Sequence, residues 1–157
     1  MRARHRGRPG ARRNPAARAG DGRGGAGALS DAAELPLGRG RQELAAAEAL
    51  LEAGFPAQAV SHAYLAGFHA ASAALAVLGE CPATSSGVIS AFGRHVVGQD
   101  GVDHETGRVL RRLYEDRNEI DNGLVDAPPE AARGALADAG RFVEATATWI
   151  GSRASRS

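Results

Sequence analysis

The sequence predicts an all-α protein, an antiparallel bundle of four to five helices that follows a disordered N-terminal tail. Hydrophobic residues make up 43% of the 157 residues, but alanine dominates them and aromatic residues reach only 4%. This composition favours closely packed helices over a β-sandwich, which needs more β-branched and aromatic residues. From about residue 41, apolar side chains recur at three- and four-residue spacings, and no segment has the pattern of a strand. Helices joined by short loops in a chain of this length predict a single bundle.

The chain divides by composition into a tail, a bundle and a short end. Residues 1–40 are rich in Arg, Gly and Ala and offer little to bury, so they are predicted to be disordered. Residues 41–151 form the predicted bundle, and residues 152–157 are predicted to be disordered. Residues 1–41 hold ten arginines against three acids, whereas the rest holds nine arginines against fifteen acids. The bundle is therefore acidic, and any surface on it that binds nucleic acid must be local.

The first two helices are bounded by glycine and proline. The first is predicted over residues 41–54, where Gly54 closes it, and the second over residues 56–79, between Pro56 and Gly79. Val60, Tyr64, Ala71 and Leu75 belong to the apolar stripe of the second helix.

The remaining helices begin at capping residues or prolines. Thr84, Ser85 or Ser86 can cap a helix that ends near residue 97, and Asp103 is a natural N-cap for a helix that runs to 122–123. Pro128 and Pro129 open the last helix, which is predicted to end near Gly151.

Cysteine, metal and membrane signals are sparse. Cys81 is the only cysteine, so an internal disulfide is impossible, and no apolar run is long enough to cross a bilayer. His62 and His69 share one helix face, but seven residues span about 10.5 Å, too far for both to hold one metal ion. We expect no cofactor, no metal ion and no membrane association, and a cytoplasmic location.

Arg117 interrupts an apolar seam. Leu110, Leu113, Ile120 and Leu124 have the spacing of a buried helix face, and the same spacing falls on Arg117. Burying a guanidinium costs several kcal/mol unless a partner lies beside it. An ion pair with Asp121, one turn further on, is the structural interpretation. A polar pocket or a subunit interface that binds phosphate fits the seam better, because a guanidinium makes bidentate hydrogen bonds to phosphate.

Three segments together resemble the HEPN domain, the higher eukaryotes and prokaryotes nucleotide-binding family. They are "SHAYLAGFHAASAAL" (61–75), "TSSGVISAFGRHVV" (84–97) and "GRVLRRLYEDRNEID" (107–121). The resemblance covers roughly residues 42–150 and is strongest to small stand-alone bacterial members, which carry a "YYAxFHAAxALL" helix and a late "RxxxDY" element. It implies a bundle of four or five helices that is usually a dimer.

The resemblance also implies site residues. Many members are ribonucleases, some are toxins neutralised by a minimal nucleotidyltransferase, and their active arginine precedes a histidine in an R-x4–6-H motif across a dimer interface. Arg117 falls on that arginine, but no histidine follows it. Asp121 matches the acid of "RxxxDY", and Asn122 replaces its tyrosine. Tyr64 keeps one of the two paired tyrosines, and His69 matches the histidine of the FHAA run.

For cleavage of RNA without a metal ion, this assignment makes Arg117 the group that stabilises the phosphorane. His69 or Asp121 would then have to replace the missing histidine as acid or base. Tyr64 and Asn122 are the expected binding residues.

Three functions remain open. The first is a dimeric HEPN protein of a toxin–antitoxin or defence module that binds or cleaves RNA or nucleotide phosphates through Arg117. The second is a catalytically degenerate interaction module that docks a nucleotidyltransferase-type partner, with Arg117 and Asp121 as a structural pair. The third is a regulatory bundle whose basic tail binds nucleic acid.

Overall fold

A computed structural model of the chain describes residues 26–156. They form five helices: α1 (Ala26–Glu52), α2 (Pro56–Val77), α3 (Ser85–His95), α4 (His104–Asp121) and α5 (Pro129–Ser155). The only β-type backbone pairing among these residues is an isolated β-bridge between Val97 and Val102. The prediction of an all-α helical bundle is confirmed.

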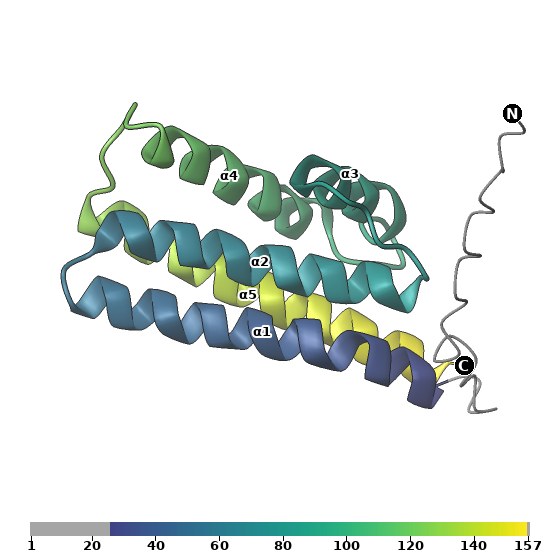
Figure 1. Cartoon of the computed structure of the whole chain (residues 1–157). Helices are drawn as coiled ribbons and strands as arrows, with labels where there is room; N and C mark the ends of the chain where they lie inside the picture. Colours follow the sequence, from purple (N-terminus) through teal and green to yellow (C-terminus); the bar gives the residue numbers. More distant parts are fainter. Residues whose placement is uncertain (1–25, 157) are drawn as a thin grey trace, which may run out of the picture.

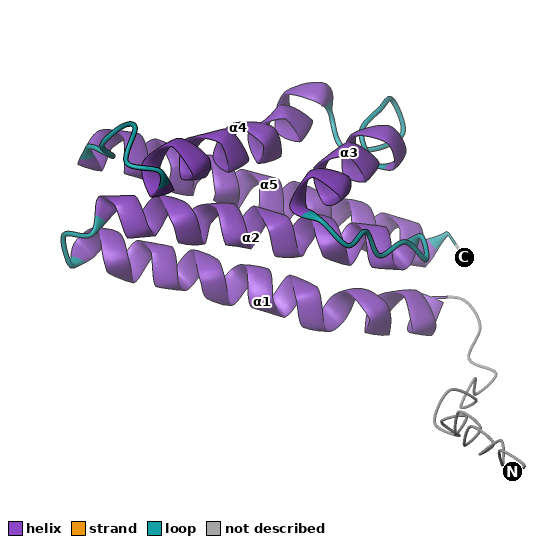
Figure 2. Cartoon of the chain, turned by 45° about the horizontal axis from the view of Figure 1, so that its top comes forward, coloured by secondary structure: helices purple, strands orange, loops and turns teal. Residues whose placement is uncertain are grey.

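Helix α2 lies at the centre of the bundle and packs against all four other helices. Figure 1 shows α1 on one side of α2 and α4 with the short α3 on the other, and α5 packs against α1, α2 and α4. Figure 2 shows the same arrangement from a second direction and the short loops that join the helices. The buried side chains of α2 are mostly alanines, which let its neighbours approach closely.

The apolar character of α2 follows from its central position. By length and composition it could cross a membrane, with a mean hydropathy of 1.2 over the best window, so the prediction that no apolar run reaches this length is wrong. Within the bundle, however, 61% of that window is buried. A helix that is surrounded by other helices has this composition without contacting lipid.

Most of the predicted helix boundaries are confirmed. The side chains of Thr84 and Asp103 cap α3 and α4 by accepting hydrogen bonds from the backbone N–H groups of Gly87 and Thr106. Pro56 and Pro129 occupy the first turns of α2 and α5. Gly54, Gly79 and Gly123 follow α1, α2 and α4 with φ values of +89°, +75° and +68°, a backbone conformation that favours glycine after a helix.

The beginning of α1 corrects the predicted start of the ordered region. The sequence pattern places it at residue 41, whereas α1 begins at Ala26 and continues through Pro36. Ala33 is only 1% exposed, and a Cβ atom at Gly40 would lie 3.0 Å from the carbonyl oxygen of Ala66 on α2. Small residues and backbone atoms thus make the contact between α1 and α2. A pattern of large apolar side chains does not indicate such a contact. Residues 1–25 of the predicted tail lie outside the described residues.

The end of α5 corrects the other boundary. The helix continues past Gly151 to Ser155, so the prediction of disorder from residue 152 is wrong for these residues. The guanidinium carbon of Arg153 lies 5.5 Å from the centre of the Trp149 ring, and the Ser155 hydroxyl donates to the Gly151 carbonyl over 3.0 Å. These local contacts support the last turn.

The close approach of α4 to α2 positions the candidate site. Gly67 of α2 is buried, and a Cβ atom there would lie 3.2 Å from a methyl carbon of Leu110 and 3.6 Å from one of Leu113. Leu110 and Leu113 are almost fully buried against this part of α2. The next turn of α4 therefore meets the preceding turns of α2, where Tyr64 lies.

Candidate functional site

Arg117 lies where the buried seam of α4 reaches the surface. Leu110 and Leu113 are buried, Ile120 is half-buried and the Arg117 side chain is 33% exposed. Leu124 follows the end of α4 and is 72% exposed, so its predicted place in the seam is wrong. Arg117 therefore combines a packed side-chain stem with a guanidinium that solvent can reach.

The guanidinium of Arg117 is held by two partners. Its Nε donates a hydrogen bond to Oδ2 of Asp121 over 3.2 Å, in the predicted ion pair one helical turn apart. Its Cζ lies 4.9 Å from the centre of the Tyr64 ring, which is a cation–π contact. The Ser61 hydroxyl of α2 donates to Oδ1 of Asp121 over 3.1 Å. Residues from two helices thus fix the orientation of one arginine.

The Tyr64 ring that contacts Arg117 packs against two further aromatic rings. The Tyr64 ring lies 5.7 Å from the Tyr114 ring and 6.1 Å from the Phe68 ring, centre to centre. Tyr64 is 1% exposed, and its hydroxyl has no hydrogen-bond partner among the described residues. Tyr114 and Phe68 are partly exposed.

His69 faces a different helix from Arg117. Burial lowers the pKa of His69 below its ordinary value of 6.5; Glu43 on α1 opposes this shift, and Arg39 on α1 adds to it. Tyr64 and His69 are five residues apart, which places them about 140° apart around α2. The structure therefore does not bring His69 to Arg117, although the Phe68 ring contacts both His69 and Tyr64.

The remaining candidate residues make other contacts. Asn122 is the exposed C-cap of α4, and its backbone N–H donates to the Asn118 carbonyl over 3.0 Å. His62 pairs with Glu43 of α1 over 2.5 Å. Among the described residues, no three His, Cys, Asp or Glu side chains form a group that could hold a metal ion.

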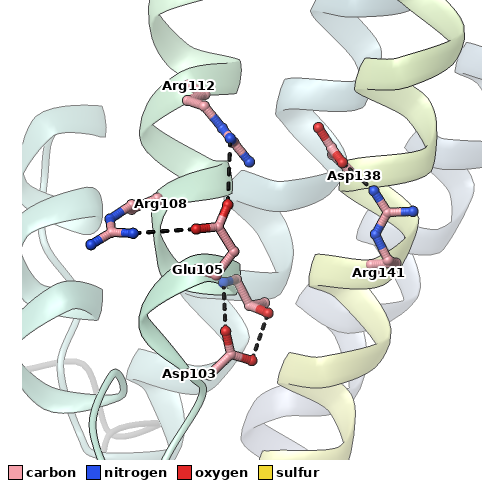
Figure 3. A network of polar contacts seen from close by, with 7 residues as sticks. Asp103, Glu105, Arg108, Arg112, Asp138 and Arg141 are labelled. Atoms are coloured by element: carbon pink, nitrogen blue, oxygen red, sulfur yellow. Dashed lines mark hydrogen bonds and ion pairs between the residues drawn. The ribbon is translucent and has the colours of Figure 1, made fainter.

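Other arginines of α4 are paired with a carboxylate on a different face of the helix. Glu105 contacts Arg108 over 3.2 Å and Arg112 over 3.6 Å, as Figure 3 shows. Arg141 on α5 pairs with Asp138. In the same view Asp103 accepts the capping hydrogen bonds of Thr106, which lower the pKa of its carboxyl group. These contacts are exposed i,i+3 pairs, a further ion pair and a cap, which are ordinary features of helix surfaces.

Ser61 and Tyr114 are site residues that the sequence pattern alone does not predict. Ser61 precedes Tyr64 by three residues, and Tyr114 precedes Arg117 by three, so each shares a helix face with a predicted site residue. This periodicity is the signal in the sequence that indicates them. It does not show which face of α2 meets α4, and the packing of the bundle supplies that fact.

Comparison with known proteins identifies the family. The HEPN domain family matches residues 33–149. A protein of Methanocaldococcus jannaschii named "Putative toxin MJ0605" is 31% identical over 103 residues, which cover 66% of this chain and 77% of that protein. The "UPF0332 protein PH1297" of Pyrococcus horikoshii is 37% identical over 76 residues, which cover 48% of this chain and 54% of that protein. The chain therefore belongs to the HEPN domain family.

Proposed function

We propose that this HEPN protein binds a phosphate of RNA or of a nucleotide through Arg117. In this proposal it acts in the cytoplasm as the toxin-like component of a toxin–antitoxin or related defence module. The orientation of Arg117 by Asp121 and Tyr64 at the end of an otherwise apolar seam is the observation that supports it.

The contacts of Arg117 leave a phosphate-binding edge free. Asp121 accepts from Nε, and the Tyr64 ring lies against the guanidinium. The two terminal nitrogens make no hydrogen bond within the described part of the chain, and the side chain is one-third exposed. A guanidinium in a fixed orientation loses little conformational entropy when it binds phosphate in a bidentate manner.

The residues around Arg117 support binding more directly than cleavage. Cleavage through the 2′-hydroxyl of RNA needs an acid and a base in addition to a group that stabilises the phosphorane. Positions 122–124 are Asn, Gly and Leu, so the family's histidine is missing, and His69 faces α1. Asp121 is the acidic group in reach of Arg117. Turnover of RNA would then depend on Asp121 or on a second copy of the chain.

The proposed partners follow from the family and from one relative. The Methanocaldococcus jannaschii protein carries the word toxin in its name, and the family resemblance implies that some HEPN toxins are neutralised by a minimal nucleotidyltransferase. We propose a homodimer that places the last turns of α4 at its interface, and a minimal nucleotidyltransferase as antitoxin. Light scattering of the purified chain tests the dimer.

An RNA-binding and RNA-cleavage assay tests the proposal. Wild type is compared with Arg117→Ala and with Arg108→Ala, after circular dichroism has shown that all three are folded. Arg108 is a matched control, because it is also on α4 and paired with an acid, but nine residues away and on the opposite face of the helix. We expect Arg117→Ala alone to weaken RNA binding about tenfold or more, the loss of one charge-assisted contact. Equal losses in both variants would show non-specific charge attraction and contradict the proposal.

A docking function is the second candidate. Phe55 is 51% exposed, and Leu124 and Val125 are 72% and 47% exposed. The α1–α2 and α4–α5 loops that carry them lie at the same end of the bundle in Figures 1 and 2. Exposed apolar side chains of this size favour a protein partner. Binding of a nucleotidyltransferase that Leu124→Ser abolishes, without RNA binding by the wild type, would favour this function over the first.

A further inference from the structure

We propose that Tyr114 and Phe68 form a stacking surface for an unpaired nucleobase whose phosphate binds Arg117. This inference rests on the proposed function and narrows the ligand to single-stranded RNA or a free nucleotide. A double helix would present its phosphates to Arg117 but not the faces of its bases.

The distribution of aromatic residues is the first observation. The chain has four Phe, two Tyr and one Trp, and most of the core is alanine and aliphatic residues. Tyr114 and Phe68 nevertheless both contact Tyr64, the ring that lies against Arg117. Such a concentration beside a cation is typical of sites that bind the base and the phosphate of one nucleotide.

The exposure of the rings is the second observation. The central ring, Tyr64, is buried and supports the guanidinium. The two outer rings, Tyr114 and Phe68, come from different helices and are partly exposed. A ring that only fills the core needs no exposed surface, whereas a stacking ring must offer part of its surface to the ligand.

The spacing is the third observation. The Arg117 guanidinium carbon lies 4.9 Å from the Tyr64 ring centre, which lies 5.7 Å from the Tyr114 ring centre. The guanidinium and the Tyr114 ring can therefore be no farther apart than the sum of these two distances. One nucleotide spans such a separation between its phosphate and its base.

Charge near Tyr114 is compatible with this ligand. Arg111 precedes Tyr114 by three residues, is exposed, and lies on the same side of α4. It would attract the next phosphate along a strand. Glu115 is also exposed beside Tyr114, so the surface is not uniformly basic. The binding of a strand would thus depend on specific contacts in addition to net charge.

The test compares three probes that separate base from phosphate recognition. They are a single-stranded 12-nucleotide uridine RNA, an abasic phosphodiester of the same length, and a 12-base-pair RNA duplex. Affinities for the full-length chain are measured at one salt concentration. We expect wild type to bind the single strand about fivefold or more tightly than the abasic strand, the range that stacking on one aromatic side chain gives. Tyr114→Leu should remove this preference, and Tyr114→Phe should retain it.

A control variant and the ratio of wild-type affinities for the single and abasic strands each test the stacking surface. Trp149→Leu changes another partly exposed aromatic residue beside an arginine, on α5, and should leave the preference unchanged. Equal wild-type affinity for the single and abasic strands would overturn the stacking surface without any variant. If Arg117→Ala weakened both in that case, the proposed function would still stand. If wild type bound no probe, the proposed function and the stacking surface would both fail.

Discussion

Ser61 on α2 donates a hydrogen bond to Asp121 on α4 over 3.1 Å, although sixty residues separate them in the chain. The other oxygen of the same carboxylate accepts from Arg117. The Asp121 carboxylate therefore links α2 to the Arg117 guanidinium and helps to fix its orientation. Ser61→Ala should weaken RNA binding roughly two- to tenfold, the loss of one hydrogen bond that positions a binding group. Titration with the single-stranded uridine RNA measures the effect.

Ser72→Ala provides the control for Ser61. Ser72 is also partly exposed and lies three turns further along α2, on nearly the same face of the helix but away from Asp121. It should bind RNA as wild type does, and Ser61→Thr should restore the hydroxyl group and most of the affinity. A loss in Ser61→Ala that Ser61→Thr does not recover would contradict a positioning role for the Ser61 hydroxyl.

The Tyr64 hydroxyl is buried without a hydrogen-bond partner among the described residues. Tyr64→Phe removes this unpaired group and keeps the ring that contacts Arg117. We expect the free energy of unfolding to rise by roughly 1 kcal/mol, because a buried hydroxyl without a partner carries a desolvation penalty. Chemical denaturation of both proteins measures the change.

Thr146 allows an independent comparison with Tyr64. Its hydroxyl is also buried and unpartnered in the described part of the chain, and its side chain is fully buried on α5. Thr146→Val should stabilise the protein for the same reason, whereas Tyr114→Phe should change stability little because that residue is partly exposed. A clear loss of stability in Tyr64→Phe would mean that the Tyr64 hydroxyl of the wild type makes a hydrogen bond, which would contradict this prediction.

Contacts within one helix were predictable from the sequence, and contacts between helices were not. The i,i+4 spacing gives the pair of Arg117 and Asp121, and a polar residue before an apolar run gives the cap at Asp103. The family match and the described helices support the fold that these patterns predict. No local pattern states that Ser61 meets Asp121 or that His69 faces α1, because both depend on how α2 is rotated within the bundle.

A different reason explains why the early start of α1 could not be predicted from the sequence. Residues 26–40 contain Pro36 and several glycines, which ordinarily indicate a loop. The packing surface is made by Ala33 and Gly40, whose small size lets α1 lie against the backbone of α2. A composition that lacks large apolar residues can therefore belong to a tightly packed helix.

Gly38 and Gly40 test this part of α1 with the same substitution at two sites. A Cβ atom at Gly38 meets nothing within 4 Å, so Gly38→Ala should raise the free energy of unfolding by about 0.5–1 kcal/mol. A Cβ atom at Gly40 would lie 3.0 Å from the Ala66 carbonyl oxygen and 3.5 Å from the Ala70 nitrogen. Gly40→Ala should therefore destabilise the protein, by about 1–3 kcal/mol. Thermal and urea unfolding measure both variants.

The two glycine variants control for each other. They share a helix and differ by two positions, so a general effect of alanine on helix propensity would move both in the same direction. Opposite signs are expected only if this segment is helical and packs on α2 through Gly40. Two neutral variants would refute the placement of residues 31–40 in α1.

Burial of His69 predicts a pH-dependent loss of stability. Because the pKa of His69 is lowered in the folded protein, the unfolded chain binds the proton first as the pH falls through about 6.5. The free energy of unfolding of wild type should therefore decrease between pH 7.5 and pH 5 relative to that of His69→Gln, which cannot take up this proton. Urea unfolding of both proteins across this range measures the difference, in which the other titrating groups largely cancel.

Glu43 and Arg39 face His69 from α1 with opposite effects on its pKa, so Arg39→Gln should make the decrease smaller. A difference that did not change with pH would show that His69 keeps its ordinary pKa and is not buried against α1.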